Sequence, residues 1–513
     1  MPRRGAGGID MNIIETIRKH AAAQPEKTAF HFRSGEITYR ELWEQSGRLS
    51  GFLTGIEMPA HHPIPVYGHK DSGMPVSFLA AVRTGHPYVP LDTNMPEQRI
   101  RDILAACGSP VLLAAEMPAF PVPGIRVVGP ADLHRIRQDR NIPGPDPALW
   151  NRKEDTHYII FTSGSTGKPK GVQVSTGNLE AYLDWSVTLV DNEPGVFLNQ
   201  APFSFDLSVM DVYTGLATGS TILSVDHDLT EDPAALQSYL EEQQPNYWVS
   251  TPSFADLCLS TPEFDGSHLC GLRKFLFCGE PLKRRTAERL LRRFPETEVI
   301  NTYGPTEATV CVTAVGITPA LLEETAADLP VGFPKPGTGM YALDREGRKL
   351  RAGETGELVI TGDTVSQGYF HNPEKTAAAF FLTEDGQRAY RTGDSGFIRE
   401  DGMVFCHGRM DGQIKFHGYR IELGDIEKNL MRLPGVEGAA VFLQKKEGSG
   451  EGLTACVLQD PAEDTSYARR KWIRTAMKER IPAYMVPRRI VFFSDFPMTM
   501  NGKLDRKKLG EMI

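Results

Sequence analysis

A strand-type run, a helical pattern and a second strand-type run follow one another repeatedly along this chain of 513 residues. The clearest case begins with the apolar run KFLFCGE (Lys274–Glu280). It continues with PLKRRTAERLLRRF, whose leucines recur at helical spacing, and ends with EVINTYGPTEAT, a strand that runs into a loop. YWVSTPS (Tyr247–Ser253) is a further strand and loop of the same kind. Such βαβ units build parallel sheets, and these bind ligands at the carboxyl ends of their strands. The pattern predicts an α/β fold with a ligand site at these loops.

The character of the sequence changes after about residue 330. Short β-type runs rich in glycine follow, and then YARRKWIRTAMKERIP, which we interpret as an amphipathic helix, and RRIVFFSDFP, a strand. Length alone would allow roughly three to four domain-sized units. The best boundary is the glycine-flanked turn GRMDGQ (Gly408–Gln413).

Composition excludes several classes of protein. The formal net charge is −9, whereas a nucleic-acid binder needs a basic face. No apolar run approaches the ~18 residues of a membrane span, and MPRRGAGGID has no apolar core that would make it a secretory signal. The seven cysteines are scattered and form no CxxC pair, so we expect reduced thiols and a cytoplasmic location.

A glycine-rich loop stands within YIIFTSGSTGKPKGVQVS (Tyr158–Ser175). It is not a Walker A loop, because Pro169 occupies the place where a metal-binding hydroxyl should follow Lys168. Glycines still allow close backbone approach to a phosphate, and hydroxyls and lysines supply donors and charge. The pattern favours polyphosphate binding over a flexible surface turn. The residues concerned are Thr162, Ser163, Gly164, Ser165, Thr166, Gly167, Lys168 and Lys170.

Three further motifs carry chemistry, each with a plain structural alternative. In NTYGPTEAT (Asn301–Thr309), Tyr303 can present a ring face to a base and Glu307 a hard oxygen ligand to Mg²⁺; a turn capped by Thr306 is the alternative. In YRTGD, Asp394 is a loop aspartate that can accept from both hydroxyls of a ribose, or an ordinary turn aspartate. In NGKLDRKKL, Lys503 follows a tight Asn-Gly turn and could equally be a solvated basic tail.

In this order and spacing, the motifs resemble those of the acyl-adenylate-forming family: acyl-CoA synthetases, adenylation domains of nonribosomal peptide synthetases and luciferase-like enzymes. FTSGSTGKPKG, NTYGPTEAT, YRTGD, GRMDGQIKFHGYRIELGDIE and NGKLDR all match, and the resemblance runs from Met11 to Leu509. Phe416-His417 and Asp425 depart from the family's usual residues, which puts carrier-facing details in doubt.

The resemblance implies a large multi-subdomain N-terminal adenylation domain over residues 11–410. A small mobile α+β lid domain would follow over 411–513, with a hinge at Asp411. Because an amphipathic stretch opens at Met11, we expect residues 1–10 to be a disordered extension, or to reflect an upstream start, rather than part of the fold. Gly418 would line the tunnel for a thiol, although an ordinary hairpin glycine is the alternative.

The resemblance also implies chemistry with ATP and Mg²⁺. A carboxylate joins the α-phosphate of ATP, pyrophosphate leaves, and the acyl group passes to a thiol. Lys503 would be the catalytic lysine between carboxylate and α-phosphate, and Glu307 would hold the metal. Besides the glycine-rich loop, the nucleotide would contact Asn301, Thr302, Tyr303, Gly304, Pro305, Thr306, Asp394, Cys406, His407, Gly408, Lys503 and Arg409, the last in the loop CHGR.

The stretch APFSFDLSVMD limits the class of acid that the chain could activate. Asp206 matches the aspartate with which amino-acid-activating members pair the substrate ammonium; Asp211 competes for that role, and we expect it to be structural. Cys278 matches a wall residue that favours D- over L-alanine, with an inert buried cysteine as the alternative, and Val310 would line the same pocket, which Lys503 also reaches. The closest resemblance is to the branch of the family that activates D-alanine.

We therefore expect a ligase that loads D-alanine on the phosphopantetheine thiol of a separate D-alanyl carrier protein, for D-alanylation of teichoic acids. No carrier module follows NGKLDRKKL. An enzyme for an L-amino acid or a short-chain acyl-CoA synthetase is the alternative; a non-catalytic nucleotide sensor is disfavoured because Lys503 and Asp394 are present. We expect a monomer.

Overall fold

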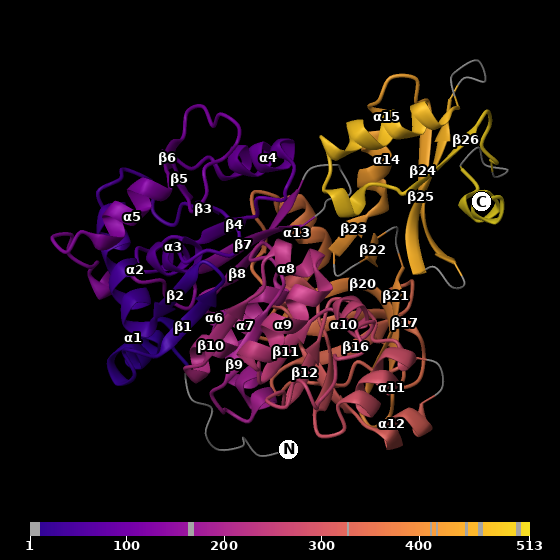
Figure 1. Ribbon diagram of the computed structural model, residues 1–513. Helices are drawn as coiled ribbons and strands as arrows, with labels where there is room; N and C mark the ends of the chain where they lie inside the picture. Colours follow the sequence, from indigo (N-terminus) through magenta and orange to yellow (C-terminus); the bar gives the residue numbers. More distant parts are fainter. Residues whose placement is uncertain are drawn as a thin grey trace. The chain divides into compact units, whose positions relative to one another are not determined.

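The structure is a computed structural model that describes residues 11–162, 169–325, 328–410, 413–416, 419–446, 450–459, 465–498 and 504–513. The chain divides into two compact units. One contains most of the chain up to Gly408, and the other contains the chain from Arg409 together with residues 94–106 and 162–170. Figure 1 shows the order of their elements along the chain.

A seven-stranded sheet carries the strand that leads into the glycine-rich loop. The pairs of β7 with β4, β4 with β3, β3 with β5 and β5 with β6 are parallel, and β18 at one edge pairs antiparallel with β8. In spatial order its described strands are β18 (Gly368–Tyr369), β8 (Lys170–Ser175), β7 (Thr156–Thr162), β4 (Tyr88–Leu91), β3 (Ile64–Tyr67), β5 (Val111–Ala114) and β6 (Arg126–Val128).

A nine-stranded sheet contains the predicted βαβ unit, which is confirmed: β12 and β13 run parallel with α11 (Arg284–Arg293) between them in the chain. Strands β12 and β11 are fully buried runs, as expected for strands covered on both faces. In spatial order its described strands are β15 (Phe333–Pro334), β14 (Thr313–Ile317), β13 (Glu298–Tyr303), β12 (Lys274–Phe277), β11 (Tyr247–Ser250), β9 (Val196–Asn199), β10 (Thr221–Ser224), β1 (Thr28–Phe32) and β2 (Gly35–Thr38).

A third, antiparallel sheet corrects two expectations. Asp394 and Arg409, both expected in loops, lie in strands β20 and β21. Both strands contain a glycine at positive φ, Gly393 (φ 68°) and Gly408 (φ 99°), and glycine within a strand resembles a turn in the sequence. The described strands are β16 (Gly339–Leu343), β17 (Gly356–Thr361), β20 (Arg388–Ile398) and β19 (Phe380–Leu382), with β21 (Val404–Arg409) paired to β20.

The helices begin at well-defined caps. Thr38 and Glu41 form a capping box on α2, and Thr251 accepts from the backbone at the start of α10. None of the helices in the described part of the chain is long and apolar enough to cross a membrane. The helices up to Gly408 are α1 (Ile13–Ala23), α2 (Tyr39–Leu53), α3 (Gly73–Val82), α4 (Glu97–Cys107), α5 (Pro130–Gln138), α6 (Thr176–Ser186), α7 (Leu207–Thr218), α8 (His227–Glu231), α9 (Pro233–Gln243), α10 (Pro252–Cys258), α11, α12 (Pro319–Glu324) and α13 (Pro373–Ala379). Short 3₁₀ helices are η1 (Pro147–Leu149), η2 (Val187–Val190) and η3 (Thr306–Ala308).

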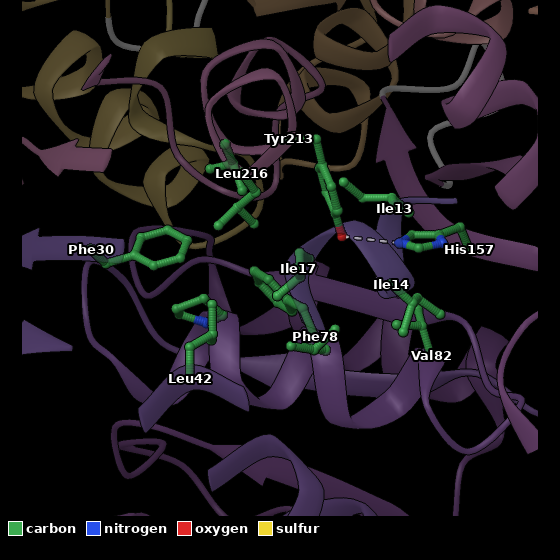
Figure 2. Close-up of a pocket in the computed structure, with 13 residues that line it drawn as sticks. Ile13, Ile14, Ile17, Phe30, Leu42, Phe78, Val82, His157, Tyr213 and Leu216 are labelled. Atoms are coloured by element: carbon green, nitrogen blue, oxygen red, sulfur yellow. Dashed lines mark hydrogen bonds between the residues drawn. The ribbon is translucent and has the colours of Figure 1, made fainter. Parts of the chain in front are cut away.

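Helix α7 lies at the centre of the largest core. Every residue from Leu207 to Leu216 is buried. Figure 2 shows Leu216 and Tyr213 of α7 facing Ile13 and Ile17 of α1 and Phe78 of α3 around a small apolar cavity of about 20 Å³. A space of that size holds at most about one water molecule, so we regard it as a packing defect of the core. The helix that begins directly after Asp206 is therefore rigidly held.

The unit from Arg409 onward has its own core of aliphatic side chains, including Ile426, Val441 and Ile473. The predicted C-terminal helix and strand are confirmed as α15 and β26. Its described elements are β22 (Gln413–Phe416), β23 (Tyr419–Glu422), α14 (Leu423–Met431), β24 (Gly438–Lys446), β25 (Gly450–Leu458), α15 (Tyr467–Lys478), η4 (Ala483–Met485), β26 (Arg489–Phe493) and α16 (Arg506–Glu511).

Candidate active site

Asp206 occupies the residue before α7, in helical backbone conformation and half-buried. Its side chain makes no capping hydrogen bond to the helix. Burial raises the pKa of the Tyr158 hydroxyl well above its ordinary value, and the charge of Asp206 adds to the rise. Tyr158 Oη is buried and has no hydrogen-bond partner among the described residues. The Asp206 carboxylate thus lies near enough to the buried Tyr158 hydroxyl to affect its ionisation.

Cys278 and Val310 lie against one another. Cys278 directly follows β12 and is buried, and its Sγ lies 3.8 Å from the carbonyl oxygen of Val310. Thr309 and Val310 both have left-handed backbone, with φ of 60° and 67°. β-Branched residues rarely adopt this conformation, which costs on the order of 1–3 kcal/mol each. Thr309 Oγ1 donates to the carbonyl of Thr364 (2.8 Å) and so helps to hold the turn that presents the Val310 carbonyl to Cys278.

Tyr303 and Asp394, from motifs far apart in sequence, meet in a buried hydrogen bond. Tyr303 Oη donates to Asp394 Oδ2 over 2.6 Å. The Asp394 amide donates to Thr392 Oγ1, which in turn donates to the carbonyl of Leu358. Burial and the Asp394 charge raise the pKa of Tyr303 well above its ordinary value, so the phenol remains a donor. Asp394 is therefore held in place from two sides.

Glu307 is fully buried in η3. Tyr369 Oη donates to its Oε1 over 2.8 Å, and the amide of Ser366 donates to its main-chain carbonyl. The suggested cap of this turn is not Thr306: Pro305 takes the cap position, and no side chain bonds there. Tyr369 was missed from the sequence, because only the pairing of β18 with β8 brings QGYF to this place.

The remaining predicted residues lie in several parts of the structure. Asn301 Nδ2 donates to the carbonyl of Pro330 and Thr302 Oγ1 to that of Phe277, so both side chains support the backbone of the motif. A Cβ on Gly304 would lie 2.4 Å from Cys311 Cα, which explains the glycine.

Thr162 ends β7 with a buried Oγ1 that has no partner among the described residues, and Lys170 begins β8. Strand β21 carries Cys406, His407, Gly408 and Arg409. Outside the described residues lie Ser163, Gly164, Ser165, Thr166, Gly167, Lys168, Asp411, Gly418 and Lys503.

A charged network, absent from the sequence prediction, supports the stretch that leads to Asp206. Lys70 Nζ donates to Asn199 Oδ1 (2.5 Å) and to the carbonyl of Ala201 (2.6 Å). Asn199 Nδ2 donates to Asp211 Oδ1 (2.8 Å), in line with the structural role expected for Asp211. Burial lowers the pKa of Lys70 to about 8, a fall that the Asp211 charge limits, and raises the pKa of Asp211. Polar residues directly after buried strands, as in VYGHKD, are the signal that could have revealed it.

A second network joins α7 to the seven-stranded sheet without a formal charge. His157 lies 3.1 Å from both Thr176 Oγ1 and Tyr213 Oη, and Tyr213 Oη donates to Tyr88 Oη (3.0 Å). Figure 2 shows the contact between His157 and Tyr213. Burial lowers the pKa of His157 to about 3, so the imidazole is neutral at physiological pH.

Comparison with known proteins agrees with this arrangement. The AMP-binding enzyme family matches residues 17–370, and the AMP-binding enzyme C-terminal domain matches residues 425–503. D-alanine–D-alanyl carrier protein ligase of Bacillus licheniformis is 43% identical over 509 residues, which cover 98% of this chain and 100% of that relative.

Two solved structures extend the comparison. A nonribosomal peptide synthetase protein with adenylation and PCP domains, bound to a vinylsulfonamide inhibitor, superposes with a TM-score of 0.82 at 26% identity, over 98% of this chain and 84% of that one. A double mutant of o-succinylbenzoate CoA synthetase from Bacillus subtilis, at 20% identity, shows the shared fold with a TM-score of 0.82 over 97% of this chain and 98% of that one. By sequence, fold and motif geometry, the chain belongs to the AMP-binding enzyme family, the acyl-adenylate-forming enzymes.

Proposed function

We propose that this chain activates D-alanine with ATP and loads it on the phosphopantetheine thiol of a separate D-alanyl carrier protein. The observation that carries the proposal is the match, at 43% identity over 98% of this chain and 100% of the relative, to a D-alanine–D-alanyl carrier protein ligase. The half-buried carboxylate of Asp206 and the contact between Cys278 and Val310 support it.

The first half-reaction joins two anions. A carboxylate oxygen of D-alanine attacks the α-phosphorus of ATP, the bond to the pyrophosphate oxygen breaks, and D-alanyl-AMP forms. In the proposed site Asp206 pairs with the substrate ammonium, Cys278 and Val310 bound the space beside the methyl group, and Lys503 lies between carboxylate and α-phosphate. Since such a preorganised cation is worth on the order of 3–4 kcal/mol of barrier, Lys503 is the proposed catalytic residue.

The nucleotide and its metal fit the residues present. Asp394, held by Tyr303, offers carboxylate oxygens to the ribose hydroxyls, and the partnerless Thr162 Oγ1 is suited to a phosphate oxygen. Glu307 is a buried carboxylate, the hard oxygen ligand that Mg²⁺ prefers, and would hold that ion. Bound there, Mg²⁺ would neutralise phosphate charge.

In the second half-reaction the thiol sulfur attacks the acyl carbon, AMP leaves, and the thiol proton passes to solvent. We propose that the C-terminal domain turns about Asp411 and that Gly418 then lines the thiol path. The product would serve D-alanylation of teichoic acids from the cytoplasm, and the enzyme would act as a monomer.

The direct test is amino-acid-dependent exchange of pyrophosphate into ATP. We expect exchange with D-alanine to exceed exchange with L-alanine and to be absent with acetate. Equal rates with both enantiomers would favour a general amino-acid adenylating enzyme, and dependence on acetate a short-chain acyl-CoA synthetase.

Asp206→Ala tests the amino-acid site separately from the nucleotide site. Removing one partner of a desolvated charge pair costs about 2–5 kcal/mol, so the KM for D-alanine should rise on the order of 100-fold while the KM for ATP stays within about 2-fold. Lys503→Ala is the matched contrast, because it should lower kcat without the same rise in KM. An unchanged KM for D-alanine in Asp206→Ala would contradict the role given to this residue.

A further inference from the structure

Three metal-ligand side chains gather at a place that the proposed reaction does not use. His69 follows β3, Asp92 follows β4, and His227 is the first residue of α8, after β10. The segments come from both large sheets, and the three residues each offer a ligand atom within 4.8 Å of the others. The carboxyl ends of parallel strands are where α/β folds bind ligands.

Both imidazoles face the same carboxylate. His69 Nδ1 lies 2.7 Å from Asp92 Oδ2, and His227 Nε2 lies 3.3 Å from Asp92 Oδ1. The two rings stack with their centroids 3.7 Å apart and their planes 11° apart. Metal–ligand bonds of about 2.0–2.1 Å in a tetrahedral site require ligand atoms roughly 3.4 Å apart. The ligand atoms here lie within 4.8 Å of one another, and His69 Nδ1 and Asp92 Oδ2 are 2.7 Å apart, so a bound ion requires side-chain shifts of about 1 Å.

The bonding of His69 is incomplete. Its side chain is 10% exposed, and its Nε2 is buried without a hydrogen-bond partner among the described residues. Desolvation without a partner costs about 1–3 kcal/mol, so an ion or a water bound to Nε2 would stabilise this arrangement. His227 is 31% exposed and forms the open side of the cluster.

We propose that His69, Asp92 and His227 form a Zn²⁺ site. Two imidazoles and one carboxylate are a donor set for Zn²⁺, whereas Mg²⁺ demands oxygen ligands. Three protein ligands leave one position for water on the exposed side of His227. The bound ion joins ends of strands from two sheets, and this site is independent of the proposed adenylation chemistry.

The test is calorimetric titration of Zn²⁺ into the tag-free, chelator-treated full-length protein. We expect one Zn²⁺ per chain and a higher melting temperature, because an ion that binds only the folded state stabilises it. His227→Ala and Asp92→Asn each remove a proposed ligand and should weaken binding by at least about 10–100-fold, the loss that follows even from removing an outer partner of a ligand. Co²⁺ in the site should show the visible absorption of a tetrahedral ion without a thiolate charge-transfer band.

Two matched controls separate this site from adventitious binding. His268 and Asp265 form a surface pair at 2.9 Å, and Cys270 is an exposed thiol, so His268→Ala and Cys270→Ser should leave the affinity unchanged. His227 is partly exposed, so His227→Ala decides the question if Asp92→Asn fails to fold. Absence of stoichiometric binding, or binding that His227→Ala does not weaken, would overturn the proposal and leave a hydrogen-bonded His–Asp–His cluster.

Discussion

Two buried polar networks hold helix α7 in place, one built on charged side chains and the other on neutral ones. The network of Lys70, Asn199 and Asp211 holds the segment before the helix and its first turns, with a cation and a carboxyl group. The network of His157, Tyr213 and Tyr88 holds the middle of the helix with neutral groups. The first bonds to the Ala201 carbonyl, in the segment that leads to Asp206, and the second packs against Tyr158 in the apolar core. The contrast indicates that a charged network positions the segment before α7, whereas neutral hydrogen bonds hold the middle of the helix in the core.

The largest effect should come from breaking the charged network. Lys70→Met leaves the Ala201 carbonyl without its lysine donor and Asn199 Oδ1 with only the 3.3 Å bond from Ser224 Oγ. Because it also removes the charge that faces the buried Asp211, it should cost about 3–5 kcal/mol of unfolding free energy. The KM for D-alanine should rise as well, since Ala201 begins the segment that ends at Asp206. Urea unfolding and pyrophosphate exchange measure the two effects.

The double variant Lys70→Met/Asp211→Asn is the control for that experiment. Removing both members of a buried pair is often far milder than removing one, so the double variant should lose less than the sum of the two single losses. Strict additivity would show that the two side chains are not coupled.

The neutral network should make the stability of the protein depend on pH in the acidic range, through His157. The unfolded His157 takes up a proton near pH 6.5, but the folded pKa is about 3, so the unfolded state binds more protons between these values and stability falls as pH falls. Between pH 6.5 and 5, His157 should lower the free energy of unfolding by about 1.5 kcal/mol. Urea midpoints of the wild type and His157→Gln measure it, and the variant should show a shallower slope over that range; parallel curves would refute a neutral buried imidazole.

The smallest effect should follow removal of one hydroxyl from the neutral network. Tyr213→Phe takes a partner from His157 and Tyr88 and should cost about 1–2 kcal/mol in urea unfolding. Tyr158→Phe is the matched control, because Tyr158 Oη has no partner among the described residues, and it should change stability by less than about 0.5 kcal/mol. Equal losses in both variants would mean that the tyrosine hydroxyl bond contributes nothing specific.

The sequence predicted what depends on local pattern. The alternation of β12, α11 and β13 is visible in apolar periodicity, because each element buries its own face. Asp394 and Arg409 were placed in loops because glycine within a strand looks like a turn until the neighbouring strand is known. The partners Tyr369 and His157 could not be predicted, since their contacts join segments more than fifty residues apart and leave no local signal.

The double attachment of α7 has a consequence for hydrogen exchange. The helix is buried from Leu207 to Leu216, and its polar bonds reach β9, β7 and β4, which belong to two different sheets. Its amides therefore cannot open by local fraying, but only when the two sheets separate. We expect the amide hydrogens of α7 to exchange with solvent deuterium only as fast as the large unit unfolds. The exchange rate of this one helix would therefore report the unfolding of that unit.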